Sequence, residues 1–163
     1  MNTTANRLAP VLAVLILLVV IAAWFGPGLY RNWRFNQTCL QLLKDAREGR
    51  TSAVVAGIVP TEQQQVGALV NQYVPADYYK DVDSLKLTSW RVSNSDKNTI
   101  WAIATCRVKQ GDGVGIFQSK MCWRWRDGHW WWDFNSSYAG EFSTSGEPEW
   151  TELSKMIDLA ELL

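Results

Sequence analysis

The sequence has few of the residues from which metal centres and catalytic sites are built. His129 is its single histidine, and its three cysteines lack the short C-x-x-C spacing of a metal site. Its 16 basic and 16 acidic residues give a formal net charge of zero, so no basic surplus is present to neutralise nucleic-acid phosphates. We therefore expect no metal site, no cofactor and no nucleic-acid partner.

Charged and amide side chains are also missing from residues 8–25. As a helix rising about 1.5 Å per residue this span reaches roughly 27 Å, close to the thickness of a bilayer's hydrocarbon core. We expect Gly26-Pro27-Gly28 to stop or kink the helix at its far end. Three aromatic residues suit the membrane interface: Trp24, Tyr30 and Trp33. The prediction is a single-pass anchor that contacts the bilayer through residues 8–25, with a cleaved secretory signal as the alternative.

The charges beside the anchor bear on the side of the membrane. Arg7 precedes it and Arg31 and Arg34 follow it, a difference that slightly favours a cytoplasmic domain. Small domains behind an N-terminal anchor are usually exported, however. We expect an extracytoplasmic, periplasmic domain in a bacterium, and keep the cytoplasm as the alternative.

Helical periodicity follows the anchor. A first helix has its apolar stripe at Phe35, Cys39, Leu42, Leu43 and Ala46. Gly49 is placed to cap its C-terminus. A second short helix is expected from Ser52 to before Pro60, and a third after a capping box at residues 61–64, with a turn or short helical segment at 76–82.

From Leu85 the apolar period changes to two, which predicts antiparallel strands. Four strands are expected, at residues 85–93, 99–109, 115–126 and 129–135, joined by short turns such as Asp127-Gly128. Small residues on the second strand would leave room for large rings on the third. This alternation places Cys106 and Cys122 on opposite sides of the sheet, so we expect free thiols, with Cys39 in the core of the first helix.

A C-terminal amphipathic helix is expected from Pro148, with its apolar stripe at Trp150, Leu153, Met156, Ile157 and Ala160. The fold class is therefore α+β: an N-terminal transmembrane helix, about three helices on a curved four-stranded antiparallel meander, and the C-terminal helix. The expected parts are a tail at 1–7, the anchor and interfacial break at 8–30, the α+β domain at 31–140, and a linker with the last helix at 141–163.

Ten tryptophans are present. In the last expected hairpin, Trp123 and Trp125 precede the turn Asp127-Gly128, and Trp130 and Trp132 follow it. The runs "LLKDAREGRTSAVVAGIVP", "LKLTSWRVS", "TIWAIATCRVK" and "GIFQSKMCWRWRDGHWWWDFN" resemble the nuclear transport factor 2-like superfamily, the cystatin-like α+β cone, over about residues 33–138. The resemblance implies a long helix wrapped by a curved sheet, and dimers through the open sheet face.

Two functions follow from the resemblance. Enzymatic, SnoaL-like members are similar in placing an Asp or a His-Asp pair inside the cone, and His129 and Asp133 are the residues here that could act as acid and base, although two solvated groups on a strand face are the simpler interpretation. Membrane-tethered members resemble this chain in their order of parts and dock other proteins. We expect a non-catalytic accessory subunit of a larger membrane complex, with partner-binding residues Trp101, Trp131 and Trp150; a small-molecule or lipid-binding cone is the alternative.

Overall fold

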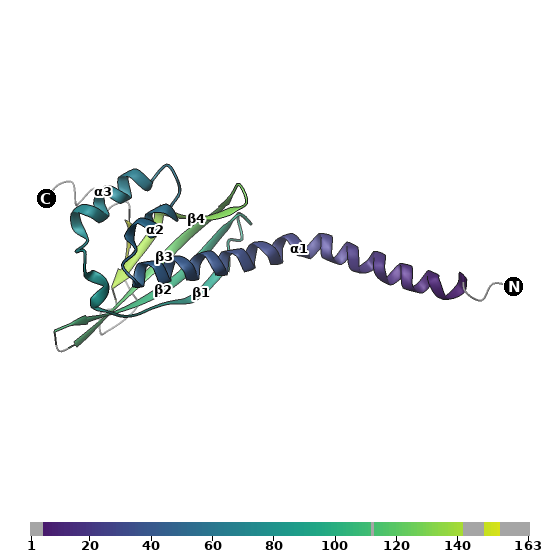
Figure 1. Ribbon diagram of the computed structural model, residues 1–163, viewed down its shortest axis with the longest axis horizontal. Helices are drawn as coiled ribbons and strands as arrows, with labels where there is room; N and C mark the ends of the chain where they lie inside the picture. The colour runs from purple at the N-terminus through teal and green to yellow at the C-terminus, as the bar shows by residue number, and fades with distance from the viewer. Residues whose placement is uncertain (1–4, 112, 142–148, 154–163) are drawn as a thin grey trace. The chain divides into compact units, whose positions relative to one another are not determined.

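The structure is a computed structural model that describes residues 5–111, 113–141 and 149–153. The chain divides into two compact units, Met1–Gln37 and Thr38–Leu163. It is an α+β protein with a long apolar N-terminal helix and an antiparallel sheet (Figure 1). Its described elements are α1 (Ala5–Arg47), α2 (Thr51–Ala56), α3 (Gln63–Tyr73), the 3-10 helix η1 (Tyr78–Lys80), β1 (Val82–Val92), β2 (Thr99–Gln110), β3 (Gly113–Arg126), β4 (His129–Glu141) and β5 (Glu149–Glu152).

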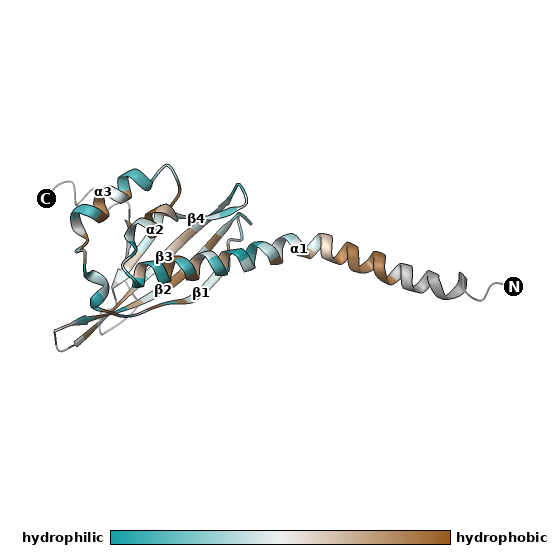
Figure 2. Ribbon diagram, in the orientation of Figure 1, coloured by the Kyte–Doolittle hydropathy of each residue, from teal (hydrophilic) through white to brown (hydrophobic). Residues whose placement is uncertain are grey.

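The first unit consists of the apolar part of α1. Its aliphatic side chains from Val14 to Ile21 are each 44–67% exposed. Figure 2 shows this stretch as hydrophobic and the later turns of α1 as mixed in character. The helix is long and apolar enough to cross a bilayer, and lipid would cover the side chains that the protein leaves bare. The unit is therefore compatible with the expected single-pass anchor.

The expected break at Gly26-Pro27-Gly28 is wrong in one respect, because α1 does not stop there. The anchor helix and the first domain helix, predicted as two elements, are one. Proline removes a single backbone donor from a helix, at a cost of about 3 kcal/mol in a soluble protein. Membrane helices accept such a residue because the remaining hydrogen bonds and local adjustments compensate for it.

In the second unit α1 ends at Arg47, and Gly49 follows it in the predicted capping position, with a φ of 73° in the left-handed region. The Arg50 amide donates to the Asp45 carbonyl (2.8 Å), and the Tyr78 hydroxyl donates to the Ala46 carbonyl (2.6 Å). A Cβ atom on Gly49 would lie 2.4 Å from Cδ1 of Tyr79. Both tyrosines of η1 thus contact the end of α1: Tyr79 packs against Gly49, and Tyr78 bonds the last turn of the helix.

The capping box expected at residues 61–64 does not form. α3 begins at Gln63, and its N-cap residue Glu62 makes no side-chain capping bond. The Glu62 carboxylate instead accepts the backbone N–H of Phe134 (2.9 Å) on β4. Glu62 thus holds β4 in place rather than capping its own helix.

The strands pair in sequence order, β1-β2-β3-β4-β5, and every pair is antiparallel. The four expected strands are present, and Asp127 and Gly128 both have positive φ, as a two-residue hairpin turn requires. The expected C-terminal helix is wrong for residues 149–152, which form β5 on the outer edge of β4. Residues 154–163, where that helix would continue, lie outside the described residues.

One face of the sheet forms the core with the helices. Ile100 and Trp123 are opposite each other and fully buried, and Ala102 lies opposite Met121, so small and large residues alternate as expected. Helices α1 and α3 add buried Cys39, Leu42, Leu43 and Val66, and the α2–α3 connection adds Ile58 and Val59. The three cysteines are free, and the register places Cys106 and Cys122 on opposite faces, which confirms the prediction.

β4 carries an irregularity that the sequence did not reveal. Its pairing with β3 shifts between Lys120 and Cys122. Ser137, fully buried, holds the shifted segment: its Oγ accepts the Cys122 N–H and the Trp132 Nε1–H (both 2.9 Å) and donates to the Asp133 carbonyl (2.6 Å). The shift places Tyr138 beside Lys120, on the face opposite the core.

Candidate functional site

The sheet face opposite the core, here called the open face, holds the chain's most distinctive surface residues. The register places Trp101 and Ile103 of β2 on it, beside Lys120 of β3. Trp101 and Ile103 are half-buried, whereas their neighbours Ala102 and Ala104 on the core face are buried. Trp101 and Ile103 therefore keep part of their surface accessible to a binding partner.

Three side chains form an aromatic–lysine cluster on this face: Trp101, Lys120 and Tyr138. The two rings have centroids 6.2 Å apart, and Lys120 Nζ lies 5.0 Å from the Trp101 centroid and 5.4 Å from that of Tyr138. Cation–π contacts of this kind stabilise an exposed arrangement by about 0.5–1 kcal/mol each. The cluster is therefore held in place before any partner binds.

A shallow groove of about 420 Å³ adjoins the cluster. Its lining comes from β1, β2 and β3: Ser89, Trp90, Arg91, Trp101, Ile103 and Lys120. Aromatic and aliphatic surface here lies next to two cationic side chains. The combination suits a partner that is partly apolar and carries negative charge.

Charge is unevenly distributed between the two faces. On the open face the register gathers Lys86, Arg91, Arg107, Lys109, Lys120, Arg124 and Arg126 against Asp133 and Glu152, and Asp83 Oδ2 lies 3.8 Å from Arg107 Nε. The whole chain has a net charge of zero, so this face is basic because acidic residues lie elsewhere. Composition alone could not show this segregation.

The two candidate acid–base residues share the open face, as the alternation predicted. Asp133 is 8% exposed; its Oδ2 accepts Arg124 Nε–H (2.9 Å) and its Oδ1 accepts the Ser136 N–H (3.0 Å). His129 is exposed, and its ring contacts that of Trp131 with centroids 6.0 Å apart. The structure thus gives the two residues different partners.

Asp133 belongs to a network that closes the other hairpin. Arg124 Nη1 donates to Thr99 Oγ1 (3.0 Å), and that hydroxyl donates to Asp96 Oδ2 (2.7 Å). The hydrogen bonds that Asp96 accepts from the Thr99 hydroxyl and the Asn98 N–H, together with the charge of Arg124, lower the pKa of Asp96. The network connects β3 and β4 to the β1–β2 turn and fixes the end of the open face.

The remaining candidate residues occupy separate places. Trp131 is half-buried on the open face opposite Arg124, and Trp150 lies in β5 opposite Gly140. In the first unit the expected interfacial residues Trp24, Tyr30 and Trp33 are 82%, 53% and 56% exposed. Their exposure suits side chains that meet lipid headgroups.

The thiols are unsuited to ionise. Burial raises the pKa of Cys122 to about 11, and burial also raises that of Cys106. No cluster of three His, Cys, Asp or Glu side chains that could hold a metal ion occurs among the described residues. Cys122 therefore serves packing in this structure rather than nucleophilic chemistry.

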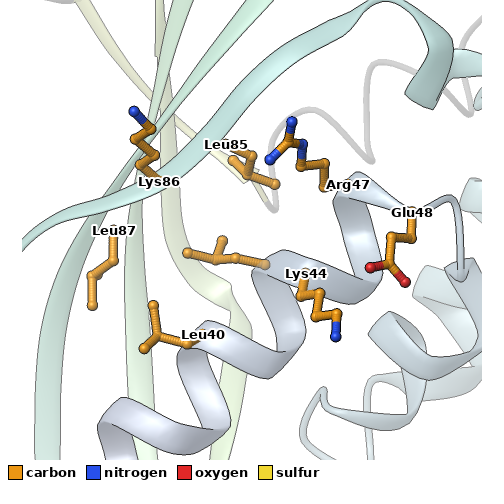
Figure 3. A pocket seen from close by; sticks show the side chains of 8 residues that line it. Leu40, Lys44, Arg47, Glu48, Leu85, Lys86 and Leu87 are labelled. Atoms are coloured by element: carbon orange, nitrogen blue, oxygen red, sulfur yellow. The ribbon is translucent and has the colours of Figure 1, made fainter.

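The sequence reasoning missed a second site, the α1–β1 groove, with a volume of about 700 Å³. Figure 3 shows Leu40 of α1 beside Leu87 of β1, and Arg47 beside Leu85. The groove is lined by Leu40, Leu43, Lys44, Arg47, Glu48, Leu85, Lys86 and Leu87. Leu40 was the available signal in the sequence, because it is a leucine outside the predicted apolar stripe. In the structure its side chain is 51% exposed.

Comparison with known proteins finds no protein-family model, no curated protein and no solved structure that matches this chain. The two surfaces are therefore interpreted from their own residues.

Proposed function

We propose that the protein is a non-catalytic, membrane-anchored accessory subunit whose open face docks another protein of a larger membrane complex. The aromatic–lysine cluster is the observation that carries this proposal. Tryptophan, tyrosine and arginine are enriched at the energetic centres of protein interfaces. Rings that are already held in place lose little conformational entropy when a partner covers them.

The basic character of the open face supports a partner with an acidic surface. Arg91 and Lys120 border the groove beside Trp101. Complementary charge increases the rate of encounter and fixes the orientation of the partner. The salt dependence of binding should therefore be marked, because exposed charges are screened over about 10 Å at 0.1 M salt.

The environment of Asp133 supports a role without catalysis. A general base must be free to take a proton from substrate. One oxygen of the Asp133 carboxylate accepts a hydrogen bond from Arg124 and the other accepts one from the Ser136 N–H, which suits a structural carboxylate. Its part in the hairpin network accounts for its burial without a reaction.

The position of the domain and its family are parts of the same proposal. We place the domain outside the cytoplasm, in the periplasm of a bacterium, and relate it to the nuclear transport factor 2-like cones. The order of helices followed by an antiparallel meander supports that relation. The fifth strand, β5, is an addition to the expected pattern.

A lipid- or small-molecule-binding domain is the second candidate. The observation that favours it is the α1–β1 groove, whose volume of about 700 Å³ falls within the usual range of ligand sites. Its four leucines would contact an acyl chain and its cations an acidic headgroup. This candidate predicts a lipid that stays bound through purification.

The docking proposal is tested by purifying the tagged full chain in mild detergent and identifying its membrane-protein partners by quantitative mass spectrometry. Trp101→Ala and Lys120→Glu should each weaken the main association by ~2 kcal/mol, about 30-fold, as expected of residues at the centre of an interface. Trp131→Ala tests the extent of the surface. Lys97→Glu, an exposed charge reversal in the β1–β2 turn, is the matched control and should leave the association intact.

Two results would reject the docking proposal. One is a full chain that purifies alone and monomeric. The other is a partner that Trp101→Ala, Lys120→Glu and the Lys97→Glu control all retain equally. A complex containing only this chain would instead identify the open face as a homodimer surface.

A further inference from the structure

β1 is the first strand of the sheet, and no described strand pairs with its outer edge. It is 11 residues long. An unpaired edge presents backbone N–H and C=O groups that can form a ladder with another extended chain. Register shifts at 82–84 and 87–89 leave residues 84–87 as a regular stretch between them.

The α1–β1 groove runs beside that regular stretch. Figure 3 shows Leu85 and Leu87 of β1 and Leu40 of α1 along it, and Leu43 also lines it. Leu43 is buried, whereas Leu40 is 51% exposed. An added strand would direct alternate side chains into the groove, where an apolar residue would cover Leu40.

The rim of the groove is cationic. Lys44, Arg47 and Lys86 line it, and no ion-pair partner of these three occurs in the described part of the chain. Glu48 is the one acidic lining residue, and it pairs with Arg50. The charge left for an incoming chain to neutralise is therefore positive.

The charges also decide between kinds of strand. A second copy of β1 would bring Lys86 and its neighbouring cations toward their own duplicates, and like charges at an interface disfavour pairing. An acidic segment would meet the same cations favourably. Backbone pairing with β1 selects an extended chain rather than a helix.

We propose that the α1–β1 groove binds an extended, acidic segment of a partner protein, which adds to the sheet beside β1 and inserts apolar side chains between Leu40 and Leu87. The inference rests on the docking role proposed above and gives the chemistry of a partner at a different surface. The open face and the groove are tested with different variants, so each can fail alone.

The test uses the full chain in nanodiscs of phosphatidylcholine, which avoids detergent entering the groove. The probes are short synthetic peptides that alternate glutamate with leucine, valine or isoleucine, and binding is followed by fluorescence anisotropy. Leu40→Glu and Lys44→Glu should each weaken binding about tenfold or more, since each removes one of the two attractions. Lys97→Glu, an exposed charge reversal outside the groove, should leave the affinity unchanged.

Two altered peptides test the mode of binding. Methylation of alternate backbone nitrogens removes the ladder donors and should abolish binding. Replacement of each glutamate by lysine should abolish it as well. Equal binding of either altered peptide, or of the original peptides to Leu40→Glu, would overturn the proposal.

Absence of binding by every glutamate peptide would also overturn it. If the peptides do not bind, but oleate binds and is weakened by Leu40→Glu, the groove is a lipid site instead. Loss of partners on Trp101→Ala with unchanged peptide binding would confirm that the two surfaces are independent.

Discussion

Glu62 is a carboxylate to which the sequence analysis gave no role, and its surroundings lead to a pH prediction. It accepts the backbone N–H groups of Phe134 (2.9 Å) and Asn135 (3.4 Å) where β4 leaves its regular pairing. Burial raises its pKa above the ordinary value of 4.5, and the charge of Asp133 adds to this effect. The two backbone hydrogen bonds act in the opposite direction and only partly offset it.

A raised pKa in the folded state means that the folded protein binds the Glu62 proton more tightly than the unfolded chain does. The contribution of Glu62 to stability is therefore fully present below pH 4.5 and is lost as pH rises through its folded pKa. Glu62→Gln keeps an oxygen for the Phe134 N–H and removes the titration. The urea midpoint of the variant should fall less than that of the wild type over this pH range.

The control for that measurement is Asp77→Asn, which changes an exposed carboxylate paired with Lys80. It should keep the wild-type pH dependence. A Glu62→Gln variant whose urea midpoint follows the wild-type pH dependence would show that another group is responsible.

Single residues also show where sequence patterns were sufficient. The alternation predicted that the second strand leaves room for large rings of the third, and Trp123 is fully buried opposite Ile100. It gave no sign that Asp133 and Ser137 would be buried as well. Their burial depends on hydrogen bonds across the β3–β4 shift, which joins residues far apart in sequence.

At the level of elements, local signals located most helices and turns. Gly49 and Asp127-Gly128 were recognised because positive φ is costly for most residues. β5 was missed because four residues have too little periodicity to distinguish a strand from the start of a helix. The α1–β1 groove was missed because it depends on how a helix and a strand lie together.

The end of α1 gives a second prediction. Gly49→Ala should lower the free energy of unfolding by about 2–4 kcal/mol, because it combines positive φ with a Cβ atom 2.4 Å from the Tyr79 ring. Gly111→Ala is the matched control: its φ of 56° is also positive, yet nothing lies within 4 Å of the new atom. It should cost only about 1 kcal/mol. Urea unfolding of the full chain in micelles measures both.

Equal losses from the two glycine variants would show that Tyr79 does not restrict the α1 terminus. A Tyr79→Ala, Gly49→Ala double variant checks the same point. It should recover the part of the loss that comes from the clash, leaving the cost of positive φ.

At the scale of the whole molecule, the exposed aliphatic surface of α1 predicts a retained anchor. The full chain should stay with membranes during alkaline extraction, and its intact mass should include residues 1–25. Deletion of residues 8–25 should release it into the soluble fraction, since the removed span supplies the apolar area that binds lipid. A mature chain that begins after residue 23 would show that the segment is a cleaved signal.

The membrane anchor proposed for α1 gives the edge of β1 a further consequence. Copies that share one bilayer diffuse in two dimensions and collide far more often than the same number in solution. Lys86 in the middle of the edge strand β1 then opposes pairing between copies, because every copy carries the same charge there when two sheets meet edge to edge. Many copies of the chain can thus share a membrane without polymerising, and the edge of β1 stays free to pair with an acidic segment.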